Sequence, residues 1–342
     1  MAFASDTLTL HWEEPQLPAE AWPRRRAQKV AEELGPWRGV AATVLTLVVW
    51  VDPTAPPQPW EDLAHIVVQR HPCRTVVVVP DPSPIAACPV SVEVTLKTRR
   101  DAPAVLFSEC LSLRPGGSLA HHWLDLVQPW ILPDLPAYLW WVGAPPPLAF
   151  PWELVAAGFT HFVLDSATTP LTHWRAALWR AWDQALRVED LQWQRLLPWR
   201  QALADAADDP RGRACLREPE TVTASWPAAS VDDLTLAVAW LAARLRWPPA
   251  MWVPAIQGAR TPQPMVSIRQ DTTTVSAVAD IDQVRCTLRR EGDTPRTRTY
   301  PRHAVDTVEA LLAVLGRGHD PVLDEVFEAV LPVLPGAASA KP

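Results

Sequence analysis

The stretch VAATVLTLVVWV, residues 40–51, decides how the first half of this 342-residue chain folds. It contains no charged residue, and its only polar side chains are two threonines. A continuous apolar run of this kind is typical of a strand that is covered on both faces. It is shorter than the roughly 20 residues that a bilayer-spanning helix needs. We therefore expect a buried central strand here and no membrane partner.

The residues that follow this strand alternate between strand and helix patterns. We expect strands over residues 75–79, 90–97, 105–113, 138–142 and 161–164, and helices over residues 60–69, 119–130, 152–157 and 170–182. Alternation of this kind predicts an α/β domain with a mixed, mainly parallel sheet and flanking helices. We assign residues 1–200 to this domain.

The second half has a different pattern, with several strands in succession. We expect strands over residues 265–269, 273–279, 284–290 and 296–300, and helices after Ser230 and over residues 305–315 and 320–334. Glu291-Gly292-Asp293 fits a hairpin turn between the last two strands. The sequence thus predicts a smaller α+β domain with an antiparallel meander over residues 201–335. We expect a surface connection at residues 204–212 and a flexible tail at residues 336–342.

The net charge, the N-terminal residues and the cysteines each exclude or disfavour a class of function. A formal net charge of −7 disfavours nucleic-acid binding, which needs a basic field. The N-terminal residues lack a basic-then-apolar signal pattern, so we expect a cytoplasmic protein. The five cysteines include no CxxC pair and no metal-type spacing, which predicts buried thiols and no metal site. A redox-sensing cysteine stays open.

The usual catalytic and cofactor fingerprints are absent from the sequence. It has no GxGxxG after a strand, no GxxxxGK[ST], no GxSxG and no HExxH. We therefore expect no cofactor and assign no catalytic residue. The chain is predicted not to be an enzyme.

Four polar residues of the first half have two interpretations each. His71 is either a general base beside an anion-binding Arg74 or a loop histidine that bonds backbone. Glu109, inside an apolar strand, either forms a structural ion pair with a residue such as Arg74 or contacts a ligand. Asp165-Ser166 follows a strand, where it either meets a ligand or forms a turn that caps the next helix.

Tryptophans and arginines form two further groups. Trp140 and Trp141 follow the lead-in Leu132-Pro133-Asp134-Leu135-Pro136, and adjacent strand residues point to opposite faces, so one ring is core and the other meets a helix or a partner. The second group contains tryptophan and arginine, the residue types that are enriched at interface hot spots. It also fits tryptophans buried in the core with arginines whose stems pack on them and whose heads reach solvent. It comprises Trp193, Arg195, Pro198, Trp199 and Arg200.

Taken in order, these segments resemble the OpcA family, the glucose-6-phosphate dehydrogenase assembly proteins. The matching pieces are His71-Pro72-Cys73-Arg74, Ser108-Glu109-Cys110, Leu132-Pro133-Asp134-Leu135-Pro136 with Leu139-Trp140-Trp141, Asp165-Ser166-Ala167, and Trp193, Arg195-Leu196 and Pro198-Trp199-Arg200. The sequence departs from the family pattern at Leu197, where a small polar residue is usual. The resemblance implies a non-catalytic partner that binds glucose-6-phosphate dehydrogenase and favours its active oligomer.

A second function hypothesis comes from another class. It is a sugar-phosphate-binding enzyme or sensor with His71, Arg74, Glu109 and Asp165 in one pocket. The two hypotheses differ in geometry, because the second needs these four side chains to converge on an open cleft. A pairing of Glu109 with Arg74 inside the core counts against it.

Overall fold

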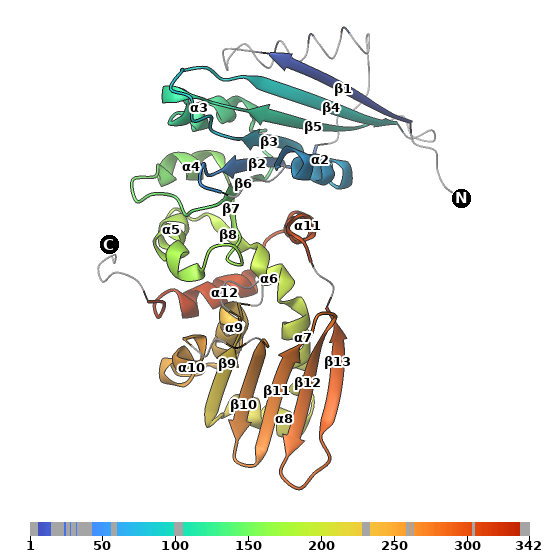
Figure 1. Ribbon diagram of the computed structural model, residues 1–342, viewed down its shortest axis with the longest axis vertical. Helices are drawn as coiled ribbons and strands as arrows, with labels where there is room; N and C mark the ends of the chain where they lie inside the picture. Colours follow the sequence, from blue (N-terminus) through green and yellow to red (C-terminus); the bar gives the residue numbers. More distant parts are fainter. Residues whose placement is uncertain are drawn as a thin grey trace. The chain divides into compact units, whose positions relative to one another are not determined.

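A computed structural model of the chain describes residues 6–14, 24, 28, 32, 43–55, 60–98, 105–227, 233–257, 261, 263–302 and 305–335 (Figure 1). The chain divides into two compact units. Unit 1 comprises residues 1–164 and 180–188, and unit 2 comprises residues 165–179 and 189–342. This division follows contacts and not independent folding, so the domain boundary near residue 200 stays a prediction. Ser230 and the predicted tail at residues 336–342 lie outside the described residues.

Unit 1 is built on a mixed sheet. Its elements are β1 (Asp6–Glu14), β2 (Thr46–Val51), α2 (Trp60–Arg70), β3 (Arg74–Val78), β4 (Val90–Thr98), β5 (Val105–Leu113), η2 (Gly117–Ala120), α3 (Trp123–Val127), η3 (Gln128–Trp130), β6 (Ala137–Val142), α4 (Trp152–Gly158) and β7 (His161–Leu164). The sheet has the order β1-β4-β5-β3-β2-β6-β7-β8, and its last strand, β8 (Arg187–Asp190), crosses the unit boundary. Strands β5, β3, β2, β6 and β7 are parallel, and β4 is antiparallel to β1 and β5. The predicted mixed, mainly parallel sheet is confirmed.

Helices cover both faces of this sheet, as Trp140 and Trp141 of β6 show. The Trp140 ring lies 5.8 Å from Trp60 of α2, and the Trp141 ring lies 6.4 Å from Trp123 of α3. Adjacent strand residues point to opposite faces, so α2 and α3 lie on opposite sides. All six residues of β2 are buried, which confirms the central strand, although this strand begins only at Thr46.

Unit 2 combines an antiparallel sheet with helices. Its elements are α6 (Leu191–Arg195), α7 (Leu197–Ala206), α8 (Pro210–Arg217), β9 (Thr221–Ser225), α9 (Thr235–Leu245), α10 (Pro249–Ile256), β10 (Met265–Gln270), β11 (Thr273–Ala279), β12 (Gln283–Arg290), β13 (Arg296–Pro301), α11 (Thr307–Arg317) and α12 (Pro321–Val330). The strands pair in the order β13-β12-β11-β10-β9, all antiparallel. Helix α5 (Leu171–Asp183) crosses the unit boundary. The predicted α+β part with an antiparallel meander is confirmed.

Two sequence-based expectations are wrong. The helix expected over residues 119–130 is broken into η2, α3 and η3, because His122 leaves the helical conformation and Pro129 has no N–H to continue the ladder. The connection expected at residues 204–212 contains the end of α7 and the start of α8. Asp209 accepts from the Arg211 N–H and Pro210 takes the first position, which is a strong helix start.

Candidate functional site

The strand order of unit 1 reverses between β2 and β6. Doubly wound sheets bind ligands at the carboxyl ends of such strands, often with a glycine-rich turn after the first strand. Here the turn after β2 reads DPTAPPQP, residues 52–59, and contains no glycine. The Asp52 N–H donates to the Val142 carbonyl at 2.8 Å, and a Cβ on Gly143 would lie 2.7 Å from the Asp52 Cβ. The turns after β2 and β6 therefore close on each other at the usual ligand position.

Aromatic packing fills the interior beside this point. The Trp50 ring lies 4.7 Å from Trp123 and 5.4 Å from Trp141, and all three side chains are buried. Among the described residues, this interior is lined by apolar rings, and the polar side chains of the turn, Asp52 and Thr54, bond to each other. In this part of the chain, the turns after β2 and β6 thus close on each other.

Arg74 and Glu109 form a buried ion pair at the opposite, amino ends of the parallel strands. Arg74 begins β3 and stands in register with Glu109 of β5. The Arg74 Nε lies 2.7 Å from Glu109 Oε2, and the two side chains are only 9% and 1% exposed. The predicted structural pair is confirmed. This geometry opposes the sugar-phosphate hypothesis, because both groups are already neutralised inside the core.

The same arginine fixes an exposed loop between η3 and β6. Arg74 Nη1 donates to the Trp130 carbonyl at 3.0 Å, and the Leu132 N–H donates to Thr46 Oγ1 at 3.3 Å. Pro133 and Asp134 are exposed, and Asp134 adopts a left-handed conformation with φ of 66°. This loop therefore presents two family-motif residues to solvent on a rigid support.

His71 and Val44 lie at the same edge as this loop, because each precedes the start of a parallel strand. His71 is half-buried, its Nδ1 has no hydrogen-bond partner among the described residues, and burial lowers its pKa. It is not a base beside a free arginine, since Arg74 is held by Glu109, and its ring nitrogen does not bond backbone through Nδ1. Val44 is 46% exposed. We define His71, Val44, Pro133 and Asp134 as the amino-end surface.

In unit 2, Asp165 and Ser166 form the predicted turn. The Asp165 side chain accepts from the Ala167 N–H at 3.1 Å, and the Ser166 N–H donates to Asp190 Oδ1 at 3.1 Å. Asp165 also makes two contacts with Arg195, at 2.6 and 3.0 Å. Asp165 and Ser166 are therefore held by internal partners of unit 2.

Asp190 caps α6 from a fully buried position. Its Oδ1 accepts from the Gln192 N–H at 2.9 Å, and its Oδ2 has no hydrogen-bond partner among the described residues. Burial, reinforced by the nearby Asp165 carboxylate, raises the pKa of Asp190 to about 7. This carboxyl group is therefore partly protonated near neutral pH.

The second Trp/Arg group also lies inside unit 2. Trp193 Nε1 donates to Asp320 Oδ2 at 2.8 Å, and the Arg200 guanidinium lies 3.6 Å from the centre of the Trp193 ring. Trp193 and Trp199 are buried, and Pro198 stands in the first turn of α7. These contacts match core tryptophans with arginine heads packed on them. A role of this group in partner binding stays a prediction.

In unit 2, His319 bridges the carboxylates of Glu189 and Asp324, an arrangement that was not predicted from the sequence. His319 Nδ1 lies 2.7 Å from Glu189 Oε1, and His319 Nε2 lies 2.7 Å from Asp324 Oδ2. Burial raises the pKa of Glu189 to about 7, against the opposing effect of His319. Burial lowers the pKa of His319, but its two carboxylate partners outweigh this and raise it. Glu189 and His319 are 130 residues apart, so local patterns could not pair them.

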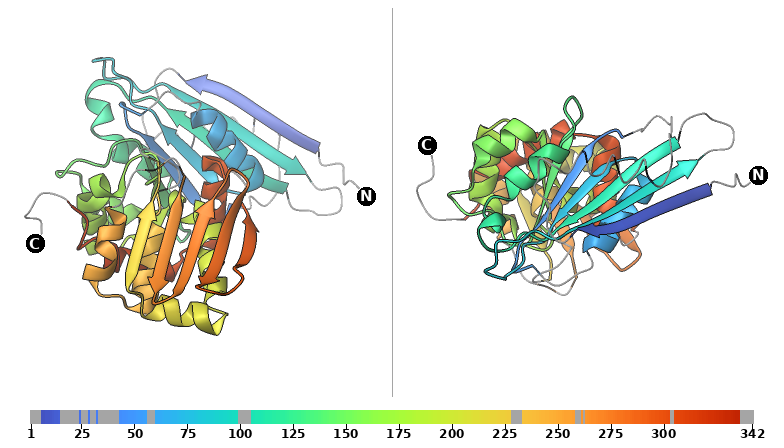
Figure 2. Two further views of the ribbon diagram at one scale, coloured as in Figure 1. Left: turned by 60° about the horizontal axis from the view of Figure 1, so that its bottom comes forward. Right: turned by 90° about the horizontal axis from the view of Figure 1, so that it is seen from above.

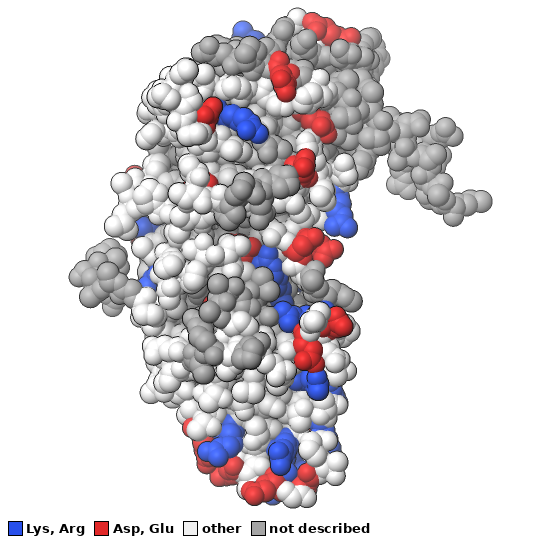
Figure 3. Space-filling model, viewed as in Figure 1, with Lys and Arg blue, Asp and Glu red and all other residues white. Residues whose placement is uncertain are grey.

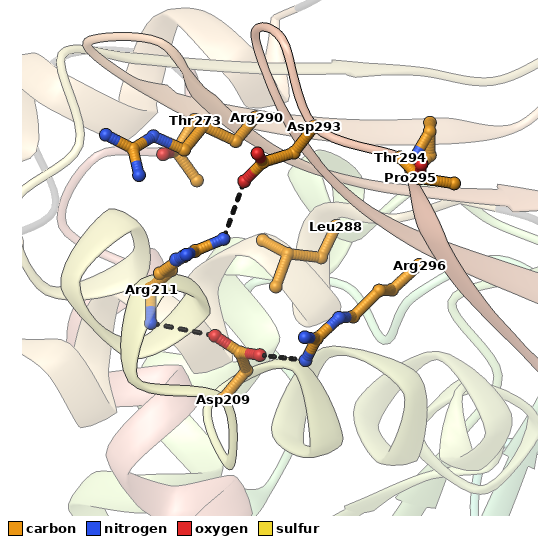
Figure 4. Close-up of a pocket in the computed structure, with 9 residues that line it drawn as sticks. All are labelled: Asp209, Arg211, Thr273, Leu288, Arg290, Asp293, Thr294, Pro295 and Arg296. Carbon is orange, nitrogen blue, oxygen red and sulfur yellow. Dashed lines mark hydrogen bonds and ion pairs between the residues drawn. The ribbon is translucent and has the colours of Figure 1, made fainter.

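A polar cavity of about 440 Å³ lies between the start of α8 and the β12–β13 hairpin (Figure 4). Arg211 Nη1 lies 2.7 Å from Asp293 Oδ2, and Arg296 Nη1 lies 3.0 Å from Asp209 Oδ2. Both arginine heads are thus held by carboxylates, and the pairs join the hairpin to the helix. Within the described residues, no three side chains of the metal-binding types are arranged to hold an ion. No described helix is long and apolar enough to cross a membrane.

Comparison with known proteins gives two family matches. Residues 64–179 match the family described as glucose-6-phosphate dehydrogenase subunit N-terminal domain, and residues 186–331 match the corresponding C-terminal domain. A putative OxPP cycle protein OpcA from Nostoc punctiforme is 25% identical over 193 residues, 56% of this chain and 41% of the relative. One from Synechococcus elongatus is 26% identical over 195 residues, 56% of this chain and 43% of the relative. The matches thus span less than half the length of these relatives.

Solved structures with similar folds are more distant. Biliverdin reductase from Synechocystis is 10% identical, with a TM-score of 0.43, and the match covers 85% of this chain and 98% of that one. The UDP-N-acetylglucosamine 3-dehydrogenase GnnA from Acidithiobacillus ferrooxidans is 11% identical, with a TM-score of 0.39 and coverage of 85% and 96%. Similarity at this level carries no conclusion about function.

Proposed function

Because this chain belongs to the OpcA family, we propose that it binds glucose-6-phosphate dehydrogenase and favours the active, assembled form of that enzyme. It acts in the oxidative pentose phosphate pathway, in the cytoplasm, without catalytic chemistry of its own. The matches to both domains of the family support this role, and so do the names of the relatives.

One observation in this chain favours binding over catalysis. The turns after β2 and β6 are in contact, with the Asp52 N–H on the Val142 carbonyl and Gly143 against the Asp52 side chain. In doubly wound enzymes this is the position that receives a nucleotide. A sheet that is closed there and presents family-motif residues at its other edge is better suited to contact a protein. We propose Pro133 and Asp134 as exposed contacts for that partner.

The proposed activation has a defined energetic requirement. A partner that binds both forms of the enzyme equally leaves the equilibrium between them unchanged. This chain must therefore bind the active form more tightly than the inactive form. A preference of about 1.4 kcal/mol shifts the equilibrium about tenfold. By linkage, ligands that favour the active enzyme must also tighten the complex.

The test uses the purified chain and the glucose-6-phosphate dehydrogenase of the same host. NADP reduction is followed against glucose 6-phosphate concentration with and without the chain, and the mixture is run on a sizing column. We expect co-migration and a higher rate at low substrate concentration. Unchanged kinetics together with separate elution would refute the proposal.

A further inference from the structure

Helices α7 and α8 cover one face of the five-stranded sheet of unit 2, and α10 packs against its edge strand β9. Within the described residues, the views of the sheet in Figure 1 and Figure 2 show no helix across the middle of its other face. Along the strands, Val266, Ile268, Val275, Ala277 and Val284 are buried, and α7 and α8 pack against strands β10–β13. The residues between them point to the opposite face, because side chains alternate along a strand. The left view of Figure 2 shows the sheet with its helix-free face toward the reader.

Hydroxyl side chains cross the middle of this open face in one row. The strand register places five residues side by side, one from each strand: Thr223, Ser267, Ser276, Thr287 and Thr297. The Thr287 and Thr297 hydroxyls lie 3.1 Å apart. Five short side chains in register make a flat strip, which suits contact with another protein surface.

Arginines border this strip on both sides. Arg269 and Arg289 stand in the neighbouring row on either side of Thr274, two strand spacings or about 10 Å apart. In the part of the chain that the structure describes, neither guanidinium has a hydrogen bond or ion pair. Arg285, on the other side of the strip, pairs with Asp280. We call the hydroxyl row with these three arginines the hydroxyl–arginine face.

The charge of this face contrasts with that of the protein. None of the strands β9–β13 contains an Asp or Glu, although the chain carries a net charge of −7. In Figure 3, charged groups gather toward the two ends of β11–β13, with uncharged surface between them. The acidic residues of this region, such as Asp271, Asp280 and Asp293, lie in turns and at strand ends.

We propose that the hydroxyl–arginine face binds an acidic surface of a partner protein. This inference rests on the proposed function and identifies the partner as the dehydrogenase. Unpaired arginines are enriched at protein interfaces and match carboxylates in bidentate geometry. A second copy of this chain is a poorer occupant, because a two-fold contact would bring arginines against arginines at the cost of like-charge repulsion.

The test measures the affinity of the dehydrogenase for wild type and for charge-reversed variants. Arg269→Glu and Arg289→Glu are expected to weaken binding by about tenfold each, and the double variant by about 100-fold. The matched control is Arg217→Glu, an exposed arginine of α8 on the covered side of the sheet, which is expected to change affinity less than about twofold. Wild-type binding should also weaken as salt is raised.

A steric variant separates contact from overall charge. Ser276→Tyr, at the centre of the hydroxyl row, keeps the charge and the strand propensity but raises a bulky ring above the flat strip. We expect it to weaken dehydrogenase binding at least about tenfold while circular dichroism and thermal melting stay unchanged. Equal effects of Arg217→Glu and Arg289→Glu would overturn the inference.

The outcomes also separate this inference from the proposed function. If wild type binds the dehydrogenase and all face variants bind equally well, the inference falls and the function stands. If wild type does not bind the dehydrogenase, the proposed function is refuted, and the dehydrogenase is not the partner of this face. If sedimentation shows a dimer of this chain that Ser276→Tyr dissociates, the face contacts a second copy and the inference is wrong.

Discussion

Asp165 and Arg195 hold each other through two parallel contacts, with Arg195 Nη1 2.6 Å from Asp165 Oδ1 and Arg195 Nη2 3.0 Å from Asp165 Oδ2. Arg195 Nε also donates to the Val305 carbonyl at 3.2 Å. The pair thus joins three segments of unit 2 that are far apart in sequence. Both side chains are about nine-tenths buried, so neither charge is well solvated.

Removal of Arg195 should therefore destabilise the protein strongly. We expect Arg195→Ala to lower the free energy of unfolding by about 3–5 kcal/mol, because it leaves the Asp165 carboxylate buried, uncompensated and close to Asp190. Arg195→Lys should recover only part of this loss, since lysine cannot form the bidentate pair. Urea denaturation of both variants measures the effect, and a loss below about 1 kcal/mol for Arg195→Ala would contradict the assigned role.

The Arg74–Glu109 pair gives a second prediction, in unit 1. We expect Arg74→Met to lower the free energy of unfolding by about 3–5 kcal/mol, because it removes the arginine that faces the buried Glu109 carboxyl group. The double variant Arg74→Met/Glu109→Leu should be markedly more stable than Arg74→Met, since it removes both charges. Denaturant titration of the single and double variants completes the cycle. If the single variant already equals wild type, Glu109 does not depend on this arginine.

Two buried carboxyl groups and one partly buried histidine of unit 2 predict how the stability of the protein depends on pH. Burial raises the pKa of Asp190 from 3.8 to about 7, the pKa of Glu189 is likewise raised to about 7, and the pKa of His319 is also raised. Each group therefore binds more protons in the folded than in the unfolded chain. Its stabilising contribution is present at acidic pH and is lost as pH rises through the folded pKa.

The variant Asp190→Asn isolates one of these groups. Asparagine keeps an oxygen for the Ser166 and Gln192 N–H groups but does not titrate. From pH 5 to pH 8 we expect the variant to gain stability relative to wild type by an amount on the order of 3 kcal/mol. Denaturant titrations at several pH values measure the difference. Parallel curves for the two proteins would mean that the pKa of Asp190 is not raised by folding.

The cysteines predict slow thiol chemistry in the native protein. All five are buried and none forms a disulfide. Burial raises the pKa of Cys73, Cys88 and Cys286 to about 11, which leaves little thiolate at neutral pH. We expect a thiol reagent such as DTNB to react slowly with the native protein and quickly with all five thiols in denaturant. A single fast-reacting thiol in the native protein would instead identify a redox-sensing cysteine.

Local patterns in the sequence were sufficient for many elements. The strands over residues 105–113, 161–164 and 273–279 match their predicted bounds. In the last two, the apolar or alternating residues are buried as the pattern requires. The strands β1 and β9 and the helix α8 were not expected. Strand β1 alternates apolar Leu8, Leu10 and Trp12 with polar residues, a period-2 pattern that could have predicted it. Helix α8 begins at Asp209-Pro210 inside a polar stretch and has no strong apolar period.

Some features of the candidate site could also be predicted from the sequence, and others could not. The sequence indicated that Glu109 needs a partner and that Trp140 and Trp141 face opposite sides, since both follow from strand geometry and the cost of burying a charge. It could not indicate the His319 bridge, whose partners Glu189 and His319 are 130 residues apart, or the full hydroxyl row, whose members align only when the register of five strands is set.

The sequence by itself determined the class of each half, the covered central strand, the family motifs and the absence of known catalytic fingerprints. Only the tertiary structure decided which carboxylate meets which arginine, that the turns after β2 and β6 close on each other, and that five hydroxyls from five strands form one row. The physical reason is the distance along the chain over which each effect acts. Periodicity and turn chemistry act within a few residues, whereas register and charge pairing are fixed when the chain folds back on itself.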